Sequence, residues 1–223
     1  SRASSLAIAR ARRSLPRVAR VGGPTKRSKK RLARAQTVTT AFFVTSRVAM
    51  APPSKACATR LARELRQFRA APPPLAPRVH VDDGDLLEWF VLIQGARDTP
   101  YERGWYVMKI KFKPTYPFAA PAVSVLTPNG RFAENQSICM SMTEWHQESW
   151  NPAWSSQAIV TGFISFMSAS EHTSGGVRTT DEEKRRLAEK SLAWNAAQPA
   201  LVKKFPELAD AAAMKALEMA KPG

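Results

Sequence analysis

The chain has 223 residues, 44% of them hydrophobic, and a formal net charge of +16 at pH 7. This length suits one domain of about 150 to 170 residues plus an extension. Because there are only two cysteines and three histidines, disulfide frameworks and multi-ligand metal clusters have few residues to draw on, and we expect neither a metal nor a cofactor. The sequence has no run of about 18 apolar residues, so no membrane-spanning helix is predicted.

The positive charge is confined to the N-terminal part. Residues 1–63 contain 16 Lys and Arg and no acidic residue, so the other 18 basic residues balance all 18 acidic ones. We interpret residues 1–53 as a basic extension that can pack little core. A disordered tail, a targeting segment and translated sequence upstream of Met50 all remain open for it. An alternative function is binding of nucleic acid or an anionic surface through this extension, without enzyme activity.

The first element after the extension is predicted to be an amphipathic helix. Leu61, Leu65 and Phe68 fall at i, i+4 and i+7, with Thr59 as the N-cap and the prolines at 72–74 as the stop. Its solvent-exposed face is expected to carry three arginines, Arg60, Arg63 and Arg66.

Three strands are predicted next, over residues 86–94, 105–112 and 122–126. The second alternates apolar and basic residues, which indicates a strand buried on one face only. The short connections favour an antiparallel meander. A long aperiodic segment, 128–153, follows, and such loops are commonly functional.

Helices are predicted after this loop. Ser155 or Ser156 can cap the first, with apolar residues of 159–167 facing inward, and Thr180 with Glu183 forms a capping box for the second. Pro206 is suited to the first position of a third helix. The fold class is therefore α+β.

Cys139 lies in the middle of the aperiodic loop and is the leading candidate for a nucleophile. A partly exposed thiol between a sheet and a helix is well placed for nucleophilic attack. Asn129 could donate its amide to an oxyanion, or hold a turn with Gly130.

Two further residues of the loop carry acid–base chemistry. His146 lies seven residues after Cys139, and Glu148 could orient His146 or an incoming nucleophile. A Cys-His pair is also found in thiol hydrolases, which cleave acyl substrates without an activating enzyme, and spacing alone does not establish the pair.

At these residues the chain resembles the ubiquitin-conjugating enzymes, in particular the branch associated with endoplasmic-reticulum-associated degradation, which is usually tail-anchored. The segments 101–106 (Y-E-R-G-W-Y) and 116–121 (Y-P-F-A-A-P) are similar to that family's Y-E-G-G and Y-P-F-x-P-P motifs. The segment 127–132 (T-P-N-G-R-F) is similar to the branch's motif, where most relatives have H-P-N. Arg103 in place of Gly, and Gln147 in place of the branch's Pro, depart from the pattern.

The resemblance implies that Cys139 accepts ubiquitin as a thioester from an activating enzyme, in an ATP-dependent pathway, and transfers it to a substrate lysine or hydroxyl. Asn129 would stabilise the oxyanion or brace the loop, and His146 or Glu148 would help to deprotonate the acceptor. A RING-type ligase would contact five residues: Arg60, Phe118, Pro152, Ala153 and Trp154.

The resemblance also implies a domain organisation and a location. Residues 54–212 would form the catalytic domain and 213–223 a C-terminal tail. We expect a cytoplasmic protein of the quality-control system, at the cytosolic face of the endoplasmic reticulum if a C-terminal anchor has been removed. No specific nucleic acid is expected as a partner.

Overall fold

The structure is a computed structural model that describes residues 51–219. The basic extension predicted over residues 1–53 lies, except for its last three residues, outside this part of the chain. The same holds for the alternative function that depends on that extension.

The centre of the fold is an antiparallel sheet of four strands in the order β1-β2-β3-β4. The strands are β1 (Arg78–Val81), β2 (Glu88–Gln94), β3 (Trp105–Lys111) and β4 (Ala122–Val125). Each strand pairs with its neighbour in sequence, so the predicted meander and the α+β class are confirmed. Strand β1 was not predicted, because its four residues are too few to show a clear alternation.

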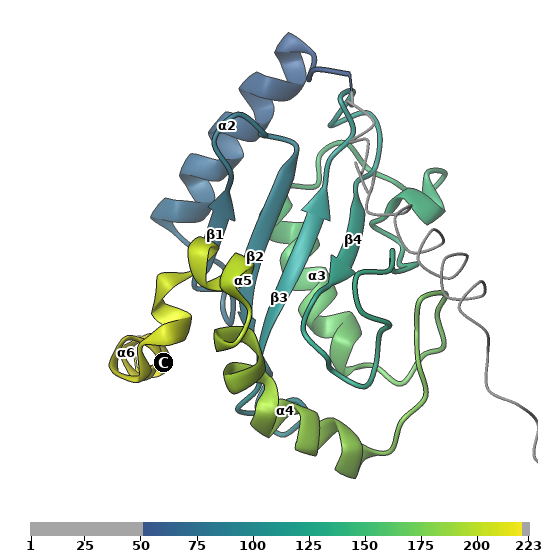
Figure 1. The fold of residues 1–223 in the computed structure, drawn as a ribbon. Helices are drawn as coiled ribbons and strands as arrows, with labels where there is room; N and C mark the ends of the chain where they lie inside the picture. The colour runs from purple at the N-terminus through teal and green to yellow at the C-terminus, as the bar shows by residue number, and fades with distance from the viewer. Residues whose placement is uncertain (1–50, 220–223) are drawn as a thin grey trace, which may run out of the picture. The chain divides into compact units, whose positions relative to one another are not determined.

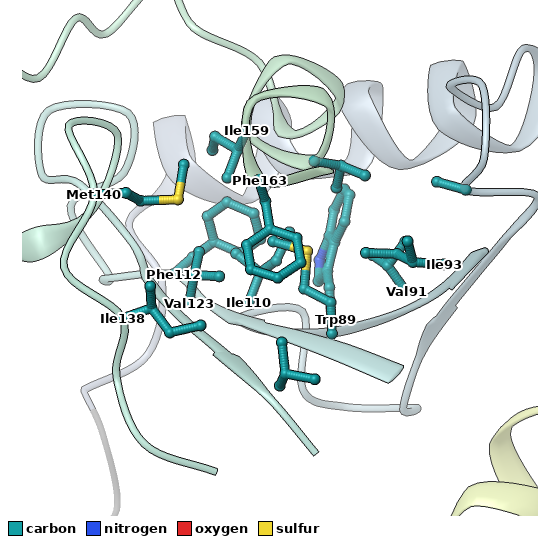
Figure 2. Close-up of a cluster of buried hydrophobic side chains, with 14 of the residues drawn as sticks. Trp89, Val91, Ile93, Ile110, Phe112, Val123, Ile138, Met140, Ile159 and Phe163 are labelled. Atoms are coloured by element: carbon teal, nitrogen blue, oxygen red, sulfur yellow. The ribbon is translucent and has the colours of Figure 1, made fainter. Parts of the chain in front are cut away.

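Helices cover both faces of the sheet (Figure 1). On one face, Trp89, Val91 and Ile93 of β2 pack in a core with residues of α2 (Lys55–Ala70) and α3 (Ser156–Ser168). Figure 2 shows Trp89 beside Phe163 of α3, with Val91 and Ile93 further along β2.

The opposite face of the sheet is covered by the C-terminal helices. Phe90 and Leu92 of β2, with Trp105 and Val107 of β3, pack in a second cluster with residues from α4 (Asp181–Ala196), α5 (Pro199–Lys204) and α6 (Ala211–Met219). The expectation that β3 is buried on one face only is therefore wrong for its first half. Both faces are buried there, because these helices pack over it.

Helix α2 begins earlier than the sequence analysis expected. Ser54, and not Thr59, is the N-cap, since its Oγ accepts a hydrogen bond from the N–H of Cys57 at 3.1 Å. Cys57 consequently lies in the first turn with its side chain fully buried.

The predicted caps of the later helices are confirmed. Ser155 caps α3 and Thr180 caps α4, each through its hydroxyl oxygen. Only the Thr180 half of the predicted capping box is formed, because the Glu183 carboxylate pairs with Arg186. Pro206 opens a 3₁₀ helix, η2 (Pro206–Ala209), where a third helix was expected, and α5 was missed. Met214 and Leu217 of α6 are buried in the second cluster. Residues 213–219 of the predicted tail thus belong to a packed helix.

Arg103 adopts a left-handed backbone conformation, with φ of 66°. This is the position at which the chain has Arg where the resembled motif has Gly. Such a φ costs a non-glycine residue about 1 to 2 kcal/mol, so the departure from the motif is a local cost to stability.

All three tyrosines of the chain, Tyr101, Tyr106 and Tyr116, are buried. Burial raises the pKa of Tyr101 to about 12 and also raises the pKa values of Tyr106 and Tyr116. An unfolded chain loses these protons near pH 10. The three protonated tyrosines therefore contribute fully to the stability of the folded chain below about pH 10. This contribution is lost as the pH rises through the raised pKa values of the folded chain.

We predict that tyrosinate absorbance will increase in one cooperative step above about pH 10, together with loss of the near-ultraviolet circular dichroism of the folded chain. Both signals can be followed in one alkaline titration. Ionisation of all three tyrosines near pH 10 in a chain that keeps its native dichroism would contradict the burial of these side chains.

Candidate active site

Cys139 lies on an irregular stretch that is held in place by the loop before α4. Its N–H donates to the carbonyl of Ser174 at 3.1 Å, and its own carbonyl accepts a hydrogen bond from the hydroxyl of Thr173. The side chain is partly exposed. The backbone of the candidate nucleophile is thus fixed on both sides of the residue, and the thiol is accessible from solvent.

A tight turn after Cys139 brings His146 back to it. Thr143 is fully buried at this turn, and its hydroxyl donates to the carbonyls of Ile138 and Met140. The short 3₁₀ helix η1 (Glu144–His146) follows. As a result Nε2 of His146 lies 3.1 Å from Sγ of Cys139. The pair that spacing alone could not establish is formed in the structure.

Glu148 completes the arrangement from the other side of the imidazole. Its Oε1 lies 2.9 Å from Nδ1 of His146. A hydrogen bond from its own backbone N–H, and next the hydrogen bond from His146, lower the pKa of the Glu148 carboxyl. An ionised carboxylate can only accept, so it favours the tautomer with the proton on Nδ1 and leaves Nε2 free to take a proton.

Asn129 is buried and uses its whole side-chain amide within its own loop. Nδ2 donates to the carbonyl of Thr127 at 3.0 Å, while Oδ1 accepts from the N–H groups of Arg131 and Phe132 at 2.9 and 2.8 Å. Gly130 has a φ of 74°, as a turn at Asn-Gly requires. This geometry favours loop bracing over oxyanion binding, because an oxyanion would have to displace bonds already made.

The expected ligase contacts fall into two groups. Phe118 is 71% exposed, so it is not part of the core, and Pro152 and Ala153 are exposed as well. Trp154 is only partly exposed and packs edge-on against Trp150.

Arg60 differs from the expectation that it lies on the solvent-exposed face of the first helix. Its side chain is 19% exposed, pairs with Glu64 and donates from Nη2 to the carbonyl of Trp154 at 3.1 Å. Arg63 and Arg66 are exposed as predicted. Arg60 is turned inward because a buried carboxylate lies one helical turn away.

The sequence analysis missed two residues around the site. Glu64 is buried and accepts hydrogen bonds from Arg60, Tyr116 and Ser156, although it lies on the apolar face of α2. An acidic residue on that face was the signal that could have identified it. Gln147, which stood out only as a departure from the motif, bonds through its side chain to the backbone of Phe118 and Ala120.

Within residues 51–219, no group of three or more His, Cys, Asp and Glu side chains is placed to hold a metal ion. Over the same residues, no helix combines the length and the apolar character needed to cross a membrane.

Comparison with known proteins places this site in a family. The family model described as ubiquitin-conjugating enzyme matches residues 60–191, more than half of the chain and a range that includes Cys139 and its loop. The chain belongs to the ubiquitin-conjugating enzyme family.

Relatives come from plants, amoebae and animals. "Ubiquitin-conjugating enzyme E2 34" of Arabidopsis thaliana is 45% identical over 157 residues, which cover 69% of this chain and 64% of that protein. "Ubiquitin-conjugating enzyme E2 J2-like" of Dictyostelium discoideum is 41% identical over 158 residues, covering 71% of this chain and 92% of that protein. "Ubiquitin-conjugating enzyme E2 J2" of Homo sapiens is 42% identical over 126 residues, covering 56% and 49%. The chain thus spans less than two thirds of the Arabidopsis relative.

The two thiols are predicted to differ sharply in reactivity. Cys57 is fully buried, which raises the pKa of its thiol, whereas Cys139 is partly exposed and lies against an imidazole. Alkylation of the native chain should therefore label Cys139 at least about tenfold faster than Cys57. Peptide mapping after a short pulse of iodoacetamide measures this. Cys57→Ala should leave the fast phase intact and Cys139→Ala should remove it; equal labelling of both thiols would contradict the described burial.

Proposed function

We propose that the chain accepts ubiquitin on Cys139 and transfers it to a substrate. The observation that carries this proposal is the Cys139–His146–Glu148 arrangement, with separations of 3.1 and 2.9 Å, within the residues that match the family. In the loading step the Cys139 sulfur attacks the thioester carbonyl at the ubiquitin C-terminus on the activating enzyme. The new S–C bond forms and the thiol of the activating enzyme leaves.

In the transfer step an acceptor amine or hydroxyl attacks the carbonyl of the Cys139 thioester, and the Cys139 thiolate leaves. The acceptor must lose a proton, which neutral His146 can take on Nε2. Glu148, hydrogen-bonded to Nδ1, would hold the ring in orientation and stabilise the imidazolium that forms. The same base serves a lysine or a hydroxyl acceptor, so both acceptor types belong to the proposal.

A RING-type ligase is the proposed partner for the surface around Phe118. Exposed aromatic side chains are frequent anchors in interfaces, and Phe118 is the most exposed large apolar residue among those described. Pro152 and Ala153 extend this surface. Arg60 and Trp154 would act by holding Pro152 and Ala153 in place, because Arg60 donates a hydrogen bond to the carbonyl of the adjacent Trp154.

The proposed setting is protein quality control at the cytosolic face of the endoplasmic reticulum, with residues 54–219, α6 included, as the catalytic domain. The T-P-N-G-R-F segment at 127–132, which resembles the motif of the branch associated with endoplasmic-reticulum-associated degradation, supports this proposal, and the similarity to the protein named E2 J2 is compatible with it.

Incubation with activating enzyme, ATP and ubiquitin, followed by gel electrophoresis with and without reductant, tests the proposed function. We expect an adduct that is sensitive to reductant in the unmodified chain and in Cys57→Ala, and no such adduct in Cys139→Ala, because only the thiol at 139 is accessible. An adduct that persists in Cys139→Ala, or no adduct with any ubiquitin-like protein, would contradict the proposal.

A further inference from the structure

The loop that presents Phe118 is joined by several hydrogen bonds to the active-site loop, the aperiodic segment 128–153 that contains Cys139. We call residues 113–121 the docking loop. Four hydrogen bonds join it to residues 144–150: Trp150 Nε1 to Pro117 O at 2.7 Å, Gln147 Nε2 to Phe118 O at 3.1 Å, Ala120 N to Gln147 Oε1 at 3.0 Å, and Glu144 N to Pro121 O at 2.9 Å. An ion pair between Lys113 and Glu144, at 2.5 Å, adds a fifth contact.

Gln147 makes two of these contacts although it is an exposed residue. Its carbonyl oxygen accepts from a backbone N–H and its amide nitrogen donates to a backbone carbonyl, so both ends are matched to the docking loop. In sequence it stands between His146, which contacts the thiol, and Glu148, which contacts His146. The carbonyl of Phe118 is therefore fixed to the residue that joins the base to its carboxylate.

We propose that Gln147 is a positioning residue that couples ligase docking at Phe118 to the orientation of His146 against Cys139. A ligase that contacts Phe118 restricts the backbone of the docking loop, and Gln147 transmits this restriction to the neighbouring imidazole. Small displacements of a catalytic base are costly, because a misplacement of about 1 Å can slow a reaction by about 100-fold. The inference rests on the proposed function of Cys139 and of the Phe118 surface.

The docking loop has other contacts that anchor it, so the role of Gln147 can be tested without detaching the loop. The bonds of Trp150 and Glu144 and the ion pair of Lys113 hold both ends of the docking loop without it. Gln147→Ala should therefore fold with the docking loop attached and lose only the link beside His146. Gln147→Glu keeps an acceptor for the N–H of Ala120 but has no donor for the carbonyl of Phe118. It should therefore weaken the coupling between ligase docking and His146 without abolishing it.

Gln136 provides the matched control. It is an exposed glutamine of the same long loop, and its side chain makes no hydrogen bond to any residue in the described part of the chain. Gln136→Ala removes the same atoms from the same loop without touching the docking loop.

The experiment measures single-turnover discharge of the loaded full chain to free lysine, with and without a RING domain chosen for binding to the unmodified chain. The RING domain is titrated to saturation for each variant, so that weakened binding and weakened stimulation are separated. At saturation we expect the stimulation ratio to fall about tenfold in Gln147→Ala, less in Gln147→Glu, and not in Gln136→Ala. The shift of the His146 imidazole resonance on addition of the RING domain should likewise disappear in Gln147→Ala, shrink in Gln147→Glu and persist in Gln136→Ala.

Full stimulation of Gln147→Ala at saturating RING domain, with the His146 resonance shifting as in the unmodified chain, would overturn the inference. It would limit Gln147 to binding or to anchoring the loop. Failure of the unmodified chain to form a thioester would instead overturn the proposed function, and the loading step shows this before any discharge is measured.

Discussion

The arrangement of the partner surface depends on one buried carboxylate. Glu64 of α2 accepts hydrogen bonds from the Tyr116 hydroxyl at 3.0 and 3.1 Å and from the N–H of Ser156 at 2.7 Å, and it pairs with Arg60. It therefore ties α2 to the docking loop and to the first turn of α3. A buried charge is tolerated only when it is fully hydrogen-bonded, and each donor left unpaired in the interior costs about 1 to 3 kcal/mol. The three elements consequently keep one relative placement, and the docking loop keeps its place beside the active-site loop.

Much of the fold could be predicted from the sequence because burial and capping are local properties. The apolar spacing of Leu61, Leu65 and Phe68, the positions of β2, β3 and β4, and the caps at Ser155 and Thr180 were predicted correctly. The errors arose where the burial of a residue depends on a partner or a covering element that the sequence pattern does not reveal. Arg60 was placed in solvent because its partner Glu64 is visible only in the folded chain, and β3 was judged to be half-buried because the covering helices lie about 80 or more positions further on.

In the candidate site, too, the chemistry of single residues could be predicted from the sequence, but their contacts could not. The sequence indicated Cys139, His146 and Glu148 as the residues with the right chemistry, but not that they meet. Their meeting depends on the turn at Thr143 and on the hydrogen bond that the N–H of Cys139 donates to the carbonyl of Ser174, 35 residues further on. Gln147 could not be predicted as a link, because a polar residue in a loop has no pattern that indicates its partners. Asn129 carried two alternative roles, and only the folded loop shows that its amide is already occupied.

In the proposed mechanism His146, oriented by Glu148, removes the acceptor's proton when Cys139 gives up its acyl group. The most direct measurement is the rate of discharge of the loaded chain to free lysine and to free serine, in the absence of ligase, for His146→Gln, Glu148→Gln and the double variant. Loss of a general base should slow discharge by about 100-fold or more in His146→Gln and by less in Glu148→Gln, while loading of Cys139 by the activating enzyme continues. Discharge of the double variant at the rate of the unmodified chain would contradict the account.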